Sequence, residues 1–168
     1  MAIKKPIDAR PLVSIVTPSY NSEKYIAETI ASVQQQTVTD WELLIVDDAS
    51  SDATVTKIKR LQAEDSRIKC FSLKENKGPA HARNLGIQKA RGKYLTFLDA
   101  DDLWFPEFLE RSSTEAKMHP FVFASYKRLD ENLEPYLSDF IVPEKVSYTD
   151  ILKSNSISCL TAFLDIEA

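Results

Sequence analysis

Short hydrophobic runs alternate with segments of helical periodicity along the first three quarters of the chain. The runs at 12–17, 41–46, 94–98 and 121–126, and a weaker one at 68–73, are rich in branched aliphatic and aromatic residues. Continuous apolar runs of this length are typical of strands buried on both faces. Between them, apolar residues recur at helical spacing, as at Ile26, Ile30 and Val33. This alternation predicts right-handed crossovers and a mostly parallel sheet, which is the α/β fold class.

Polar residues and prolines mark the expected helix starts. Asn21 or Ser22 is expected to cap the first helix, and Ser51 or Asp52 the second. Pro106 is expected to open the helix that follows the run at 94–98.

The third predicted helix carries a face of small residues. Pro79 suits its first turn and Gly92 fits just past its end. Small side chains recur at helical spacing at Ala82, Gly86 and Ala90. We therefore expect the backbone of this helix to lie close to the sheet.

The periodic pattern weakens after Arg128. A polar stretch containing Pro135 and Pro143 leads to a short predicted helix at 148–153. A last apolar run covers 160–164, almost at the end of the chain. This region therefore predicts few elements.

Composition and charge narrow the class of protein. The chain has 168 residues, of which 43% are hydrophobic and 27% charged, which suits one soluble globular domain. A net charge of −4 gives no reason to expect nucleic acid as a partner. No apolar segment reaches the roughly 18 residues of a transmembrane helix, and the first 11 residues lack a signal-peptide core. We expect a cytoplasmic protein, with peripheral contact at the inner face of the membrane left open, and inert thiols at Cys70 and Cys159.

Acidic and polar residues follow the predicted strands at their carboxyl ends. Asp47 and Asp48 follow the second strand, and Asp99, Asp101 and Asp102 follow the fourth. In an open α/β sheet, ligands bind at this edge. Carboxylates gathered from separate loops repel one another unless a cation binds among them. Oxygen ligands of this kind suit Mg²⁺ or Mn²⁺, so we expect one of these cations as cofactor.

Glycine is scarce, and this excludes two nucleotide-binding classes. The three glycines are Gly78, Gly86 and Gly92, and neither GxGxxG nor GxxxxGK[ST] occurs. Dinucleotide-binding Rossmann proteins and P-loop NTPases need those glycines so that backbone amides can hold phosphates. Here a metal held by acidic side chains would neutralise the phosphates instead, which indicates a nucleoside diphosphate bridged by a cation.

Two long segments carry a resemblance to a known family. They are VSIVTPSYNSEKYIAETIASVQQQTVTDWELLIVDDASSDAT and NKGPAHARNLGIQKARGKYLTFLDADD. Together they resemble the family 2 glycosyltransferases, over about residues 12–110, with the family's DxD motif at 99–101. The resemblance implies a GT-A fold, a Rossmann-like three-layer sandwich with a mostly parallel central sheet. It also implies an inverting transfer from a nucleotide sugar to an acceptor hydroxyl.

The resemblance assigns residues to the nucleoside. Pro18 and Tyr20 would flank the base, with Tyr20 packed on its face. Asp48 would accept a hydrogen bond from the ring N–H of uracil, which implies a UDP-sugar donor. Gly78 would let the backbone pass close to the nucleoside. Asp47, by contrast, is expected to cap a turn.

The resemblance also assigns residues to the metal and the diphosphate. Asp101 would bind the metal directly, while Asp99 would reach the ribose or the water shell of the metal. Arg83 would either face the diphosphate or pair with a neighbouring carboxylate. Asp102 is expected to cap the following helix rather than bind metal.

The acceptor side of the family pattern is only partly present. We divide the chain into an N-terminal tail (1–11), a nucleotide-sugar-binding core (12–120) and the start of an acceptor-side half (121–168) that is expected to be truncated. The general base is expected beyond Ala168, since Asp165 and Glu167 would lie at a frayed chain end. Donor binding is therefore expected, while completed transfer by this polypeptide is not. The acceptor would be an unidentified glycan or lipid-linked molecule.

Two other functional classes fit parts of the sequence. A non-catalytic module that only holds the nucleotide sugar would need the same donor residues. A receiver-like signalling domain would bind Mg²⁺ at Asp47 and Asp48. The second alternative is disfavoured because the acidic pair follows the second strand instead of the first.

Overall fold

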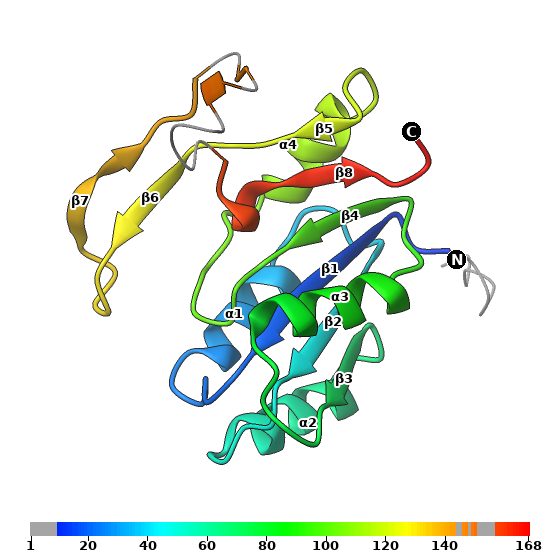
Figure 1. Cartoon of the computed structure of the whole chain (residues 1–168), viewed down its shortest axis with the longest axis vertical. Coiled ribbons are helices and arrows are strands. Elements are labelled where there is room, and N and C mark those ends of the chain that lie inside the picture. Colours follow the sequence, from blue (N-terminus) through cyan, green and yellow to red (C-terminus); the bar gives the residue numbers. More distant parts are fainter. Residues whose placement is uncertain (1–9, 144–145, 148, 151–156) are drawn as a thin grey trace.

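A computed structural model describes residues 10–143, 146–147, 149–150 and 157–168 (Figure 1). Most of the helix expected at 148–153 and nearly all of the N-terminal tail lie outside these residues. The elements are β1 (Val13–Ser19), α1 (Ile26–Gln34), β2 (Trp41–Asp47), α2 (Thr54–Glu64), β3 (Ile68–Ser72), α3 (Pro79–Lys89), β4 (Tyr94–Phe97), α4 (Phe108–Glu115), β5 (Phe121–Val122), β6 (Tyr126–Leu129), β7 (Pro135–Phe140), the 3₁₀ helix η1 (Cys159–Thr161) and β8 (Phe163–Asp165).

The central sheet has six strands in the order β3-β2-β1-β4-β8-β5. The strands β1 to β4 are parallel, and Val13 of β1 lies between Trp41 of β2 and Tyr94 of β4. Only β8 runs against its neighbours, pairing antiparallel with both β4 and β5. The predicted α/β class with a mostly parallel sheet is confirmed.

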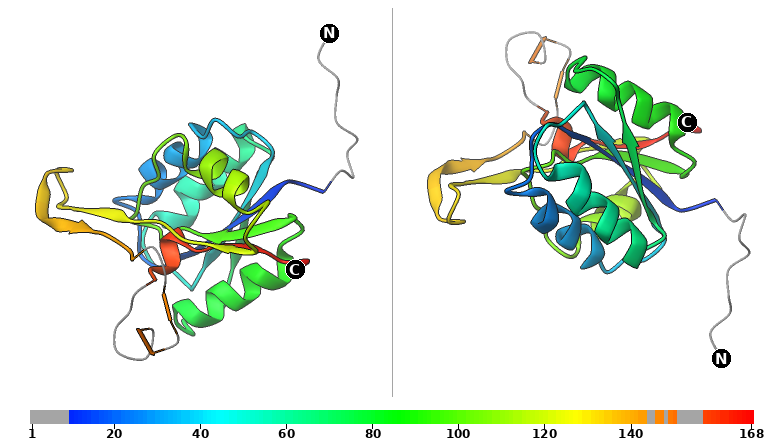
Figure 2. Two further views of the ribbon diagram at one scale, coloured as in Figure 1. Left: turned by 90° about the horizontal axis from the view of Figure 1, so that it is seen from above. Right: turned by 90° about the horizontal axis from the view of Figure 1, so that it is seen from below.

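Helices cover both faces of this sheet (Figure 2). On one face, apolar residues of α1, α2 and α4 join the larger core cluster, with Ile30, Ile58 and Leu109 fully buried. On the other face, α3 covers a smaller cluster around Val16 and Leu44. The result is the expected three layers, with the sheet in the middle.

The close approach of α3 to the sheet depends on a glycine. A Cβ atom added to Gly86 would lie 2.3 Å from a methyl group of Val16 on β1. Ala82 of the same face is fully buried. The predicted face of small residues is confirmed, and it fixes α3, with its N-terminus, against β1.

Two helices begin later than the sequence suggested. α1 starts at Ile26 instead of directly after Asn21 or Ser22, and the Asn21 side chain, which was expected to cap it, accepts the N–H of Ser51 in the neighbouring loop instead. α4 starts at Phe108, two residues after Pro106, and the Gln36 side chain accepts the N–H of Leu109 at 3.0 Å. At both starts, the side-chain contacts join segments that are distant in sequence.

The region after α4 differs most from expectation. The strand expected at 121–126 divides into β5, which pairs with β8, and β6, which leaves the central sheet. β6 pairs with β7 in a separate antiparallel hairpin that projects from the body (Figures 1 and 2). The rings of Tyr126 and Phe140 stack across it at 4.9 Å, and Glu131 at its tip pairs with Lys24. Since most of β7 is exposed, its sequence lacks the apolar pattern that would predict a strand.

The end of the chain is held, contrary to the expectation that it would fray. Asp165 belongs to β8, lies opposite Tyr94, and its carboxylate is 3.6 Å from the Lys93 ammonium. Glu167 pairs with Arg10 near the other end of the described chain. In the part of the chain that the structure describes, no helix has the length and hydrophobicity needed to cross a bilayer.

Candidate functional site

A cavity of about 420 Å³ opens at the carboxyl edge of the sheet, beside the N-terminus of α3. Its lining includes every residue that the sequence assigned to the nucleotide sugar or the metal, namely Pro18, Tyr20, Asp48, Gly78, Arg83, Asp99 and Asp101. These residues come from β1, from α3 and from the loops that follow β1, β2, β3 and β4, and they span the sequence from Pro18 to Asp101. The parallel topology brings them together because it places the carboxyl ends of the strands at one edge.

Asp48 is buried and fixes the loop between β3 and α3. Its two carboxylate oxygens accept the backbone N–H of Lys77 at 2.8 Å and that of Gly78 at 2.7 Å. Its own N–H donates to the carbonyl of Ser19 at 2.8 Å. Gly78 has φ of +85°, a conformation that favours glycine. Asp48 therefore joins the end of β1, through its backbone, and the loop before α3, through its side chain.

Asp47 forms hydrogen bonds in a turn and does not line the cavity. Its carboxylate accepts the N–H of Ser50 at 3.1 Å and also the Ser50 hydroxyl, and it is absent from the cavity lining. The expected turn-capping role of Asp47 is confirmed.

Aromatic and apolar groups form one side of the cavity. Tyr20 is 51% exposed, so its ring is accessible to a ligand, and Pro18 lies two residues before it. Tyr25 also lines the cavity, and the Lys24 ammonium is 5.0 Å from the centre of its ring. Tyr25 was not among the site residues predicted from the sequence. The available signal was its place just before a helix that begins at the ligand-binding edge.

The acidic end of β4 forms another side. The Arg83 guanidinium donates to the carboxylate of Asp99, whereas Asp101 is exposed and has no hydrogen-bond or ion-pair partner among the described residues. Burial, followed by the charges of Asp101 and Asp99, raises the pKa of Asp102 to about 6. Asp102 does not cap α4, contrary to expectation, because that helix begins only at Phe108.

The side chains that line the cavity can supply only part of the coordination shell of a divalent cation. Within the described ranges, no group of three or more His, Cys, Asp or Glu side chains is arranged to hold a metal. Mg²⁺ and related ions are commonly held by one or two carboxylates together with substrate phosphates and water. Asp99 and Asp101 supply such a pair, so the chain fits a cation that shares its coordination with a bound diphosphate.

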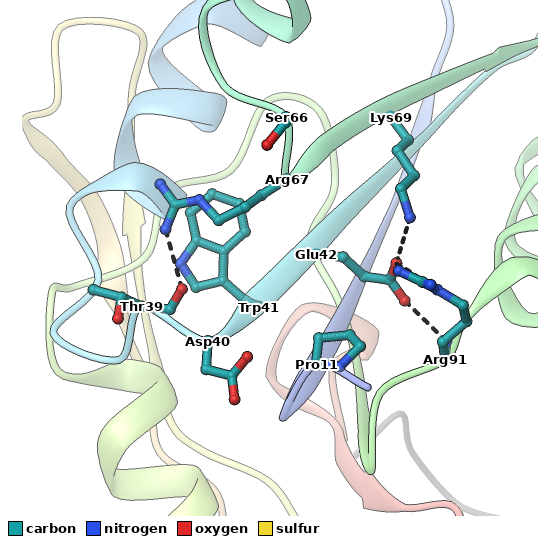
Figure 3. Close-up of a pocket in the computed structure, with 9 residues that line it drawn as sticks. All are labelled: Pro11, Thr39, Asp40, Trp41, Glu42, Ser66, Arg67, Lys69 and Arg91. Carbon is teal, nitrogen blue, oxygen red and sulfur yellow. Dashed lines mark hydrogen bonds and ion pairs between the residues drawn. The ribbon is translucent and has the colours of Figure 1, made fainter. Parts of the chain in front are cut away.

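A second cavity, of about 280 Å³, lies at the opposite edge of the sheet (Figure 3). Its cations are already paired. Lys69 and Arg91 reach the buried carboxylate of Glu42, at 2.8 and 3.3 Å. Arg67 pairs with Asp65 at 2.7 Å and lies over the Trp41 ring, 3.7 Å from its centre. The charges at this edge are used to hold the strands together.

The sequence model described as "Glycosyl transferase family 2" matches residues 14–158. The chain belongs to this family. Among its relatives, a putative teichuronic acid biosynthesis glycosyltransferase of Bacillus subtilis, TuaG, is 41% identical over 94% of the chain and 64% of its own length. The Escherichia coli enzyme WfgD, a UDP-Glc:alpha-D-GlcNAc-diphosphoundecaprenol beta-1,3-glucosyltransferase, is 40% identical over 92% of the chain and 60% of its own length. The chain thus spans less than two thirds of these relatives.

Solved structures of other glycosyltransferases share the GT-A fold. Residues 1–349 of Staphylococcus aureus TarS, in complex with UDP-GlcNAc, superpose with a TM-score of 0.74 and 26% identity, over 91% of the chain and 45% of that structure. The mannosyltransferase PcManGT of Pyrobaculum calidifontis, in complex with GDP-Man and Mn²⁺, has a TM-score of 0.68 and 21% identity, over 98% of the chain and 49% of that structure. The predicted GT-A architecture of this family 2 chain is confirmed.

Proposed function

We propose that the chain forms the nucleotide-sugar-binding part of an inverting glycosyltransferase that uses a UDP-sugar and Mn²⁺ or Mg²⁺. The observation that carries this proposal is the convergence of Asp48, Arg83, Asp99 and Asp101 on one cavity at the carboxyl edge of the sheet. A charged set of this kind, with an aromatic ring beside it, suits a nucleoside diphosphate.

The nucleoside would bind between Tyr20 and Asp48. The exposed ring of Tyr20 offers a face for the base. A carboxylate has about four lone-pair positions, and backbone N–H groups use two of those on Asp48. The others remain for the ring N–H of uracil. The UDP donors named for WfgD and for the TarS complex support this choice of base.

The diphosphate would lie between Arg83 and the carboxylates that follow β4. Asp101 is exposed on that side and has no partner in the described part of the chain, and Asp99 also lines the cavity there. A bound divalent cation would stabilise negative charge on the departing diphosphate as a Lewis acid. Arg83 would orient the phosphates from the side of α3. The Mn²⁺ bound by PcManGT, which shares the fold, is compatible with this arrangement.

The remainder of the chain would begin the acceptor side. We assign residues 12–120 to the donor-binding unit and 121–168 to the first part of the acceptor half. The named substrate of WfgD supports a lipid-linked glycan acceptor, and hence work at the cytoplasmic face of a membrane in cell-envelope glycan synthesis. Asp165 pairs with the first residue of β4, at the edge away from the cavity, so it is not positioned as the general base.

Nucleotide preference tests this function. Calorimetric titrations of the chain with UDP, GDP and ADP, each with Mn²⁺ present, compare the three bases at constant phosphate chemistry. One charge-assisted hydrogen bond contributes roughly 1.5–3 kcal/mol, so UDP should bind at least about tenfold more tightly. Equal affinity for all three nucleotides would contradict the proposed recognition of uracil by Asp48.

A further inference from the structure

Two residues that the proposed function assigns to groups of opposite charge are bound to each other. The Arg83 guanidinium, from α3, donates to a carboxylate oxygen of Asp99, which follows β4, at 2.5 Å. The side chains are 24% and 34% exposed, so both are reachable from the cavity that they line. In this arrangement the guanidinium of Arg83 takes the place of a cation beside Asp99, and the carboxylate of Asp99 takes the place of a phosphate beside Arg83.

Arg83 has no substitute in this cavity. Within the described residues, it is the one lysine or arginine in the lining, against three carboxylates, Asp48, Asp99 and Asp101. Its buried Nε has no hydrogen-bond partner among the described residues, so Asp99 satisfies the guanidinium only in part. A diphosphate offers several oxygens, which suit a guanidinium better than one carboxylate oxygen does.

We propose that Arg83 and Asp99 form an exchange pair that couples nucleotide binding to cation binding. The inference rests on the proposed function. When a diphosphate binds, Arg83 turns from Asp99 to the phosphate oxygens, and this frees a carboxylate oxygen of Asp99 for the cation. Without nucleotide, Asp99 offers the cation only the oxygen that Arg83 does not hold, and Asp101 is the other carboxylate available on that side.

The exchange predicts effects of opposite sign from one substitution. Arg83→Met keeps much of the apolar stem and removes the guanidinium. It should strengthen the binding of Mn²⁺ alone, because Asp99 is released. It should weaken UDP, because the diphosphate loses its cationic partner. Asp99→Asn should cost little Mn²⁺ affinity in the absence of UDP and much more in its presence.

The test is a double-mutant cycle on Mn²⁺ binding, followed by electron paramagnetic resonance of free Mn²⁺, in the native chain, Arg83→Met, Asp99→Asn and the double variant. Couplings between sites commonly correspond to about 5–150-fold in affinity. We expect Arg83→Met to tighten Mn²⁺ at least about fivefold without nucleotide, and Asp99→Asn to remove that gain. We expect UDP to tighten Mn²⁺ at least about fivefold in the native chain and far less in Arg83→Met.

A purely electrostatic effect of the substitution, without exchange of partners, would give a different result in the double-mutant cycle. If Arg83→Met acted only by removing a positive charge, the gain would persist in the Asp99→Asn background, and that result would overturn the inference. Unchanged Mn²⁺ affinity in Arg83→Met would do so as well. Lys74→Met, an exposed charge neutralisation in the loop before α3, is the control and should change Mn²⁺ affinity less than about twofold. Failure of UDP to bind the native chain with Mn²⁺ would overturn the proposed function itself, separately from the nucleotide-free comparison.

Discussion

The carboxylate of Asp48 accepts the backbone N–H of Gly78 at 2.7 Å, across 30 residues of sequence. This contact ties the end of β2 to the residue before α3, which carries Arg83. The parts of the cavity assigned to the base and to the diphosphate are therefore fixed to each other by one side chain. In consequence, Asp48 shapes the donor site even before any ligand binds.

Asp48→Asn should weaken UDP by about tenfold or more and also destabilise the fold. The substituted amide retains one acceptor, while its NH₂ group faces a backbone N–H, so one of the two loop hydrogen bonds is lost. Charge-assisted hydrogen bonds contribute roughly 1.5–3 kcal/mol each. Calorimetry with UDP and chemical denaturation measure both effects. Asp47→Asn, which changes a neighbouring carboxylate that is bound to Ser50 and does not itself line the cavity, is the control, and an equal loss of UDP affinity in both variants would contradict this role.

Gly86→Ala should destabilise the protein by about 1–3 kcal/mol, because the added methyl group meets Val16. The strain should also displace α3 and thereby weaken UDP. Val16→Ala in the same chain makes room for the methyl group, so the double variant should be more stable than the sum of the two single changes predicts. Urea unfolding of the three variants measures this. Simple additivity would show that α3 does not rest on Val16.

The protein should lose stability in acid because the Asp65 carboxylate becomes protonated. Hydrogen bonds from the Arg67 side chain, together with its charge, lower the pKa of Asp65 to about 2. A carboxyl group whose pKa is lower in the folded state stabilises the fold above its unfolded pKa, near 4, and this contribution disappears as the pH falls toward 2. Asp65→Asn should therefore cost about 1–2 kcal/mol at pH 7 and progressively less below pH 4. Glu64→Gln, an exposed neighbour, is the control; a cost independent of pH would contradict the assignment.

Glu42→Ala should destabilise the protein by about 2–4 kcal/mol and leave UDP affinity unchanged. Burial acts to raise the pKa of Glu42, but hydrogen bonds from Lys69, Ser14 and the N–H of Arg91 outweigh it and hold the pKa below its ordinary value. These contacts join β1, β2, β3 and the loop after α3 at the edge away from the donor cavity, and Figure 3 shows those of Lys69 and Arg91. Urea unfolding and UDP calorimetry separate the two effects. Loss of UDP affinity in the folded variant would show that the two edges are coupled.

The first half of the fold could be predicted because its strands are buried on both faces. Such strands appear as continuous apolar runs, and β1, β2 and β4 lie within a residue or two of the runs at 12–17, 41–46 and 94–98. The positions of the site residues could be predicted for a related reason. A parallel sheet collects the residues after each strand at one edge, so Asp48 and Asp99 could be placed together before their contacts were known.

The remainder depends on partners that lie far away in sequence. Gln36 provides the contact at the start of α4 that the sequence seemed to give to Asp102. The antiparallel insertion of β8 between β4 and β5 is set by pairings such as Thr96 with Phe163, which no local pattern encodes. The Arg83–Asp99 pair had been one of two open possibilities, because spacing alone cannot tell a carboxylate partner from a phosphate.

The most direct test of the account is the affinity of the chain for UDP with Mn²⁺ and with EDTA, measured by calorimetry. Because no glycine-rich loop is present to hold the diphosphate, we expect UDP affinity to fall at least about tenfold when the cation is removed. Asp101→Asn should remove most of the affinity that depends on the cation, since it deletes an anionic ligand. Equal UDP affinity with Mn²⁺ and with EDTA would contradict the metal-bridged donor site.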